Sequence, residues 1–136
     1  MKFLIVEDDF AARKLLQTYL SVYGECAIAV NGREAIEAFS ESLKEGQSYD
    51  LICLDVMMPE MDGYEALKAI RQIEKERGTN SGDGVKVIMT TALSDFENIA
   101  SAFRSGCESY LVKPIRKDDL LDEMEKLGIT GLKVTS

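Results

Sequence analysis

The sequence predicts an α/β domain in which helices cover both faces of a doubly wound, five-stranded parallel sheet. Short apolar runs alternate along the chain with segments whose apolar residues recur at helical spacing. The 136 residues, 46% of them hydrophobic, suit one domain with one core. Strands that alternate with helices pair in parallel through right-handed crossovers, so a single open sheet is expected.

Five strands are expected from the apolar runs. The third run is continuously apolar, which is typical of a central strand covered on both faces. The fifth run is followed by Pro114, which cannot continue it. In chain order the predicted strands are residues 3–6, 27–30, 51–54, 85–89 and 110–112.

Each strand is followed by a predicted helix. The first covers residues 10–22, where apolar residues repeat at helical spacing. The next three open with capping pairs, in which a capping side chain is followed three residues later by Glu: Asn31 with Glu34, Asp62 with Glu65, and Ser94 with Glu97. The third, fourth and fifth helices are expected to end near Gly78, Gly106 and Gly128. The segment 78–84, rich in Gly, Ser and Asn, is predicted to be a loop.

This succession predicts the strand order 2-1-3-4-5, the flavodoxin-like arrangement. In such sheets the binding crevice opens at the carboxyl ends of strands one and three, where the winding direction switches. Polar residues follow four of the predicted strands at that edge: Glu7, Asp8, Asp9, Asp55, Thr90, Thr91 and Lys113. Each alone is explained by helix capping or by a solvated surface charge. Their convergence on one edge predicts a functional site.

The chemistry of this site is limited to carboxylates, hydroxyls and lysine, because the chain contains no histidine. Hard oxygen ligands favour Mg²⁺ over zinc or copper, and Asp8 and Asp55 leave room for an incoming phosphate. A carboxylate nucleophile beside a cation, a lysine and a hydroxyl is suited to forming an aspartyl phosphate. Asp55 is therefore predicted to be the nucleophile, with Lys113 neutralising the phosphoryl oxygens.

Composition excludes several other functions. The net charge of -8 and pI near 4.6 argue against direct nucleic-acid binding, which depends on Lys and Arg. The apolar run at the N-terminus is too short for a signal sequence or a membrane span, so a cytoplasmic protein is expected. Three separated cysteines, without a C-x-x-C pair, are predicted to be reduced thiols.

Four segments together resemble the response-regulator receiver domains of two-component signalling. They are Leu4-Ile5-Val6-Glu7-Asp8-Asp9, Leu54-Asp55-Val56-Met57-Met58-Pro59-Glu60-Met61-Asp62-Gly63, Thr91-Ala92 and Tyr110-Leu111-Val112-Lys113-Pro114. The resemblance extends from Met1 to about Leu127, and the joint occurrence of these motifs in order is highly specific. It suggests a single-domain receiver similar to the chemotaxis regulators. Residues 128–136 are then a short tail with no effector domain.

The resemblance also implies roles for individual residues. Asp55 would be the phosphoacceptor, and Mg²⁺ would be bound by Asp8, Asp55 and the backbone carbonyl of Met57, with Glu7 acting through water. Thr91 and Lys113 would contact the phosphoryl group, and Tyr110 would be the aromatic switch residue. The Lys113–Pro114 bond would be cis. The chain departs from the family pattern at Glu7, where Asp is frequent, and at Ile115, where Phe is frequent.

The implied partners are a sensor histidine kinase or a histidine phosphotransfer protein, and an unknown downstream protein that detects phosphorylation. A motor or chemotaxis component, a relay protein and a separate enzyme are alternative outputs. Two rival functions are a phosphatase of the haloacid dehalogenase type and a receiver that only binds proteins. The first normally has a second Asp two residues after its nucleophile, a position that Met57 occupies here.

Two apolar residues are predicted to set the lifetime of the phosphoryl group. Met57 lies two residues after Asp55, and Leu93 lies two residues after Thr91. Both positions should border the path of a hydrolytic water, and neither side chain can hydrogen-bond that water. Slow self-hydrolysis is expected unless both side chains point into solvent.

Overall fold

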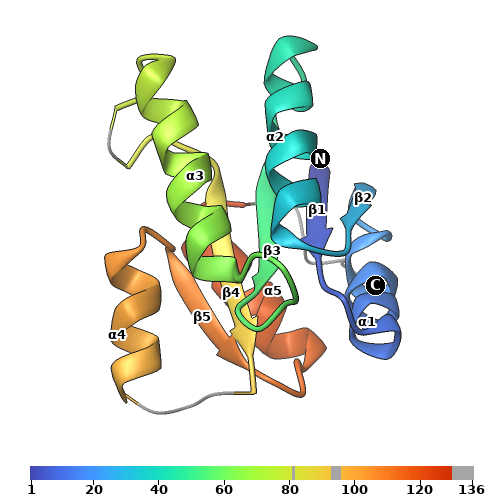
Figure 1. The fold of residues 1–136 in the computed structure, drawn as a ribbon. Coiled ribbons are helices and arrows are strands. Elements are labelled where there is room, and N and C mark those ends of the chain that lie inside the picture. The colour runs from blue at the N-terminus through green and yellow to red at the C-terminus, as the bar shows by residue number, and fades with distance from the viewer. Residues whose placement is uncertain (81, 93–95, 130–136) are drawn as a thin grey trace.

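A computed structural model describes residues 1–80, 82–92 and 96–129. Strands and helices alternate along these ranges (Figure 1). The strands are β1 (Lys2–Val6), β2 (Glu25–Ala29), β3 (Leu51–Asp55), β4 (Lys86–Thr91) and β5 (Ser109–Val112). The helices are α1 (Phe10–Leu20), α2 (Gly32–Lys44), α3 (Gly63–Glu76), α4 (Phe96–Arg104) and α5 (Lys117–Lys126).

The strands form one parallel sheet in the order β2-β1-β3-β4-β5, which confirms the predicted fold class and topology. In its register Val6 pairs with Leu54, and Asp55 pairs with Thr90. The carboxyl ends of β1 and β3 are therefore neighbours. All five residues of β3 are buried, as expected for the centre of the sheet.

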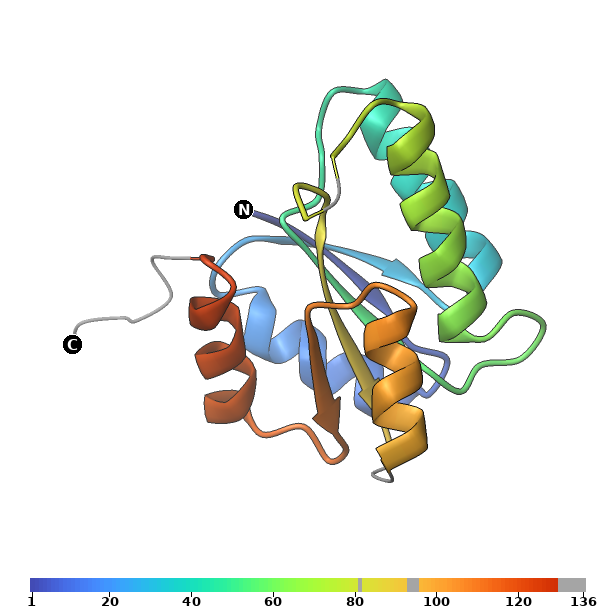
Figure 2. The same cartoon turned by 90° about the vertical axis from the view of Figure 1, so that its left-hand side faces the viewer.

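Two apolar layers separate the sheet from its helices. Leu4, Ile52 and Val87 face the layer that contains buried residues of α2, α3 and α4. Phe3, Cys53 and Ile88 face the layer that contains buried residues of α1 and α5. Figure 2 shows α2 and α3 together on one side of the sheet and α1 and α5 together on the other. Successive residues of each strand thus enter different layers.

The predicted element boundaries differ from the structure by a few residues. Helix α1 ends at Leu20 rather than Val22, whose side chain is exposed. Strand β2 begins at Glu25 rather than at residue 27, because its backbone pairing with β1 includes the polar Glu25 as well as the apolar residues. Strand β4 includes Thr90 and Thr91, because pairing with β3 and β5 holds both hydroxyl residues in the sheet.

Side-chain caps fix the starts of two helices as predicted. Asn31 Oδ1 accepts a hydrogen bond from Glu34 N at 2.9 Å, and Asp62 Oδ1 accepts one from Glu65 N at 2.9 Å. The Glu34 carboxylate accepts from Val30 N, one residue before the cap. The predicted cap at Ser94 lies outside the described residues, as do 130–136 of the predicted tail.

Cys26, Cys53 and Cys107 are free thiols, as predicted. The Lys113–Pro114 peptide bond is cis, as the resemblance implies. No helix within the described ranges is long and apolar enough to span a membrane.

Candidate functional site

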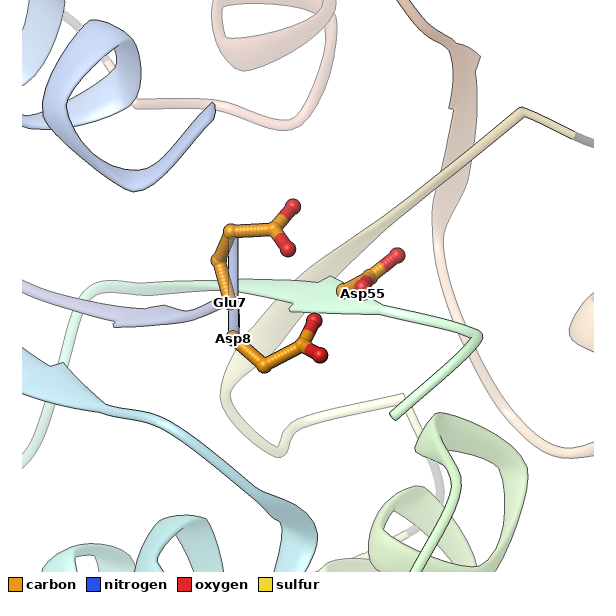
Figure 3. Close-up of side chains that lie close together, drawn as sticks. All are labelled: Glu7, Asp8 and Asp55. Carbon is orange, nitrogen blue, oxygen red and sulfur yellow. The ribbon is translucent and has the colours of Figure 1, made fainter. Parts of the chain in front are cut away.

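Three carboxylates meet where β1 and β3 end (Figure 3). Glu7 and Asp8 directly follow β1, and Asp55 is the last residue of β3. One carboxylate oxygen from each residue lies within 4.8 Å of the other two. Glu7 and Asp55 are buried, whereas Asp8 is exposed. The topology therefore brings together residues 48 positions apart in the sequence, as predicted.

Lys113 connects this cluster to β5. Its ammonium nitrogen forms an ion pair with Glu7 Oε1 and lies 3.3 Å from Asp55 Oδ1. Three carboxylates facing one lysine leave the site with an excess of negative charge. A small divalent cation would balance that excess, and the oxygen-only donor set fits Mg²⁺.

The environment of Asp55 disfavours an isolated charge. Burial, together with the neighbouring Glu7 charge, raises the pKa of Asp55 to about 7, and Lys113 opposes both. For Lys113, burial lowers the pKa, but the two carboxylates outweigh burial and raise it. Lys113 thus offsets the charge of Asp55 only in part, which is consistent with the fit to a divalent cation.

Two further predicted residues, Thr91 and Tyr110, lie on neighbouring strands. Thr91 is fully buried and follows Met89 on the face covered by α2, α3 and α4. Tyr110 is half-buried and packs against the same layer, from the strand next to that of Thr91. These two residues therefore share a face, with Thr91 at the end of β4 nearest the acidic cluster.

Met57 lies two residues beyond Asp55, in the loop between β3 and α3. Its side chain is 63% exposed, so it does not seal the site as a buried residue would. Leu93, the other residue predicted to affect hydrolysis, lies outside the described residues.

The same loop returns to Asp55 through a glycine whose role was not predicted. Gly63 is buried at the start of α3, and its amide donates a hydrogen bond to Val56 O at 2.9 Å. A Cβ atom at this position would overlap the carbonyl oxygen of Asp55. The sequence contained only an indirect signal, since Gly63 directly follows the capping residue Asp62.

Fold and site together define the class of doubly wound α/β domains with an acidic, lysine-bridged site at the topological switch point. The chain belongs to the response regulator receiver domain family, whose model matches residues 3–125. It is therefore a receiver domain of two-component signalling.

Individual relatives agree with this assignment. The chain is 32% identical over 127 residues to the chemotaxis protein CheY of Bacillus subtilis, covering 92% of this chain and 95% of that protein. It is 38% identical to a probable transcriptional regulator, ycf27, of Cyanidium caldarium, covering 86% of this chain but 42% of that protein. It is 37% identical to hybrid signal transduction histidine kinase B of Dictyostelium discoideum, covering only 6% of that protein. The chain thus spans a minor part of several larger relatives.

A solved structure shows the same fold. The co-crystal structure of the Saccharomyces cerevisiae histidine phosphotransfer protein Ypd1 and the receiver domain of its downstream response regulator Ssk1 matches with a TM-score of 0.83. The match has 28% identity and covers 99% of this chain and 93% of that chain.

Proposed function

We propose that Asp55 accepts a phosphoryl group from a phosphohistidine of a sensor kinase or phosphotransfer protein, and that the resulting charge alters binding to a downstream protein. The observation that carries the proposal is the position of Asp55, which is buried, close to two other carboxylates and 3.3 Å from Lys113 Nζ. A nucleophilic carboxylate held beside cationic groups is suited to phosphoryl transfer.

The phosphoryl group would pass directly from the donor nitrogen to Asp55. An Asp55 oxygen forms a bond to phosphorus while the phosphorus–nitrogen bond of the donor breaks, and the donor nitrogen keeps the electron pair. Lys113 lies close enough to Asp55 to neutralise charge on the phosphoryl oxygens. In hydrolysis, a water oxygen bonds to phosphorus while the bond between phosphorus and the Asp55 oxygen breaks. Asp55 leaves as a carboxylate, and the proton of the water passes to the released phosphate or to solvent. The chain would thus catalyse its own phosphorylation and its own slow dephosphorylation.

Mg²⁺ would be held by Asp8 and Asp55, with the Met57 carbonyl as a further ligand and Glu7 acting through water. When bound, the ion supplies positive charge for the phosphoryl oxygens. Glu7 Oε1 pairs with Lys113, which fits a role outside direct coordination.

Thr91 and Tyr110 would convert phosphorylation into a surface change. Thr91 ends β4 near Asp55, and Tyr110 packs on the same sheet face. A phosphoryl dianion would draw the Thr91 hydroxyl toward it, and Tyr110 would move into the vacated space.

The surroundings of the site support a protein as phosphodonor. An apolar hollow of about 380 Å³ borders the site and is lined by Glu7, Ala11, Ala12, Leu15, Leu16, Lys113, Pro114 and Ile115. An apolar surface beside the nucleophile is suited to docking a protein that presents a phosphohistidine. The co-crystal structure of Ypd1 with a receiver domain, whose fold is similar to that of this chain, supports this kind of partner. We assign the receiver to residues 1–127.

Labelling with a small phosphodonor tests the proposed function. Incubation with ³²P-phosphoramidate and Mg²⁺ should label the chain in a form that hydroxylamine removes, as expected for an acyl phosphate. Asp55→Asn should abolish the label, whereas Asp122→Asn, at an exposed acid on α5, should not. Rapid release of phosphate without retained label would support the phosphatase, and absence of both would support a receiver that only binds proteins.

Mg²⁺ should stabilise the folded protein, because it relieves repulsion among the carboxylates. A ligand at 100 times its dissociation constant adds about 2.7 kcal/mol to the free energy of unfolding. Thermal melts with and without millimolar Mg²⁺ measure this shift. Asp8→Ala should remove the response, and Asp122→Ala, which makes the same change in charge on α5, should retain it. An unchanged wild-type midpoint contradicts the assignment of the metal site.

The phosphoryl lifetime should depend on Met57 and Leu93. We expect Met57→Asn combined with Leu93→Glu to accelerate decay of labelled Asp55 about tenfold, because polar groups there can orient the attacking water. Decay is followed after donor removal at constant Mg²⁺. Val22→Asn, which alters a similarly exposed apolar residue after α1, is the control. A double variant that decays at the wild-type rate rules out this role.

A further inference from the structure

Thr90 is a buried hydroxyl residue with no role in the proposed chemistry so far. Its side chain is fully buried, and its Oγ1 has no hydrogen-bond partner among the described residues. Native proteins pair nearly all buried polar groups, because an unpaired one is costly. Valine has a similar shape and is equally suited to a strand, so the local backbone does not require a hydroxyl here.

The strand register places Thr90 beside the nucleophile. Asp55 of β3 pairs with Thr90 of β4, which pairs in turn with Leu111 of β5. Paired residues of parallel strands project to the same face of a sheet. Thr90 follows Ile88, and Asp55 follows Cys53, at the two-residue spacing that continues the layer shared with α1 and α5. The hydroxyl-bearing side chain is therefore on the same face as Asp55.

Lys113 must cross the strand that carries Thr90. It follows β5, yet its ammonium group reaches Asp55 on β3 and Glu7 after β1. Strand β4 lies between β5 and β3, so the lysine side chain spans the width of β4 at its carboxyl end. Thr90 is the last residue of β4 in register with the Asp55 face, because strand alternation assigns Thr91 to the other face, whose layer contains Met89 two residues earlier.

We propose that Thr90 is a positioning residue for Lys113, whose hydroxyl accepts a hydrogen bond from the ammonium group when Asp55 is phosphorylated. This inference rests on the proposed function. Phosphorylation converts the Asp55 carboxylate into an uncharged acyl group and adds a phosphoryl dianion, which draws Lys113 away from Glu7. The ammonium has three N–H donors, and a threonine hydroxyl offers two acceptor lone pairs. Thr90 would then hold Lys113 against the phosphoryl group.

The proposal also accounts for the hydroxyl that is unpaired in the present state. In the unphosphorylated site Lys113 is held by Glu7 and Asp55, and the Thr90 hydroxyl remains available. Phosphorylation moves the positive charge toward β4, where that hydroxyl lies. Thr90 would thus favour the phosphorylated arrangement and the transition state that leads to it.

A double-mutant cycle tests the proposal. The rate of Asp55 labelling by phosphoramidate is measured for wild type, Thr90→Val, Lys113→Met and the double variant. We expect Thr90→Val to slow labelling about tenfold, as for the loss of one hydrogen bond to a charged group. Thr90→Ser, which retains the hydroxyl, should stay within about twofold of wild type. In the Lys113→Met background, Thr90→Val should have no further effect, because its partner is absent.

Thr90→Val should increase the stability of the unphosphorylated protein while it slows labelling. Removing an unpaired buried hydroxyl should raise the urea midpoint of unphosphorylated Thr90→Val, so slower labelling would not be due to unfolding. Equal labelling of Thr90→Val and wild type overturns the proposal. So does an equal slowing by Thr90→Val in the presence and absence of Lys113, or a Thr90→Ser variant as slow as Thr90→Val. If wild type itself is not labelled, the proposed function fails and the inference fails with it.

Discussion

Replacing Arg71 with Met is expected to lower the free energy of unfolding by about 3–5 kcal/mol, because it leaves two partly buried carboxylates without their counter-ion. Arg71 Nη1 contacts Glu74 Oε1 at 2.8 Å, and Nη2 contacts Glu108 Oε1 at 2.8 Å. Glu74 is only 7% exposed, so water cannot replace the lost arginine easily. Urea unfolding of both proteins at neutral pH measures the difference.

The arginine also satisfies backbone carbonyl groups from two parts of the chain. It donates two hydrogen bonds to Gly106 O and one to Val85 O. Glu74 in turn accepts from Val85 N at 2.7 Å, and Glu108 accepts from Val87 N at 2.9 Å. The network therefore joins α3, the start of β4 and the turn before β5. Removing its centre leaves carbonyl groups unpaired as well as charges.

The loss from Arg71→Met should be greater at neutral pH than in acid. Burial raises the pKa of Glu108 above 4.5 in the folded protein, and Arg71 opposes this rise. Removing Arg71 should raise that pKa further. When a carboxyl has a higher pKa in the folded state than in the unfolded state, the folded protein binds more protons than the unfolded chain between these two pKa values. The free energy of unfolding therefore falls as pH increases from 4.5 toward the folded pKa. The difference between wild type and variant should therefore shrink toward pH 4.5.

A control substitution distinguishes the loss of the Arg71 network from the loss of one positive charge. Lys68→Met removes one positive charge from an exposed position of the same helix, so it should cost less than about 0.5 kcal/mol. If the two variants lose the same stability, the Arg71 network contributes nothing beyond surface charge.

The fold was predictable because its signals are local. Alternating apolar runs and helical stripes identify the five strands and helices, and right-handed crossovers restrict how they can be ordered. Boundaries were less accurate where pairing with a neighbour decides them. Glu25 joins β2 and Thr90 joins β4 through ladders to adjacent strands, which their own polarity does not predict.

The site was predictable for a related reason. Parallel strands deliver their carboxyl ends to one edge, so Glu7, Asp8, Asp55 and Lys113 could be expected together from their positions alone. Arg71 and Glu108 follow no such rule. They are 37 residues apart, and each resembles an ordinary surface charge in the sequence. The pairing of Thr90 with Asp55 required the observed register.

Replacing Gly63 with Ala should disrupt both the fold and the proposed phosphoacceptor. The added Cβ atom would overlap the Asp55 carbonyl oxygen and lie 3.0 Å from its carbonyl carbon and from Met89 Cε. The backbone cannot yield as a flexible side chain can, so α3 or the end of β3 must move. We expect a loss of about 2–3 kcal/mol in the free energy of unfolding. Displacement of Asp55 by about 1 Å would slow phosphorylation about 100-fold.

Gly46→Ala provides the control, since it adds the same atom without a collision. Gly46 has φ of 71°, and no atom lies within 4 Å of the position that its Cβ would occupy, so only the backbone preference is lost. That loss should be about 1 kcal/mol, with phosphorylation unchanged. Measuring the labelling rate well below the melting temperature of both variants separates the position of Asp55 from global stability. A Gly63→Ala variant that is labelled as fast as Gly46→Ala would show that the contact between α3 and the Asp55 backbone does not position the Asp55 side chain.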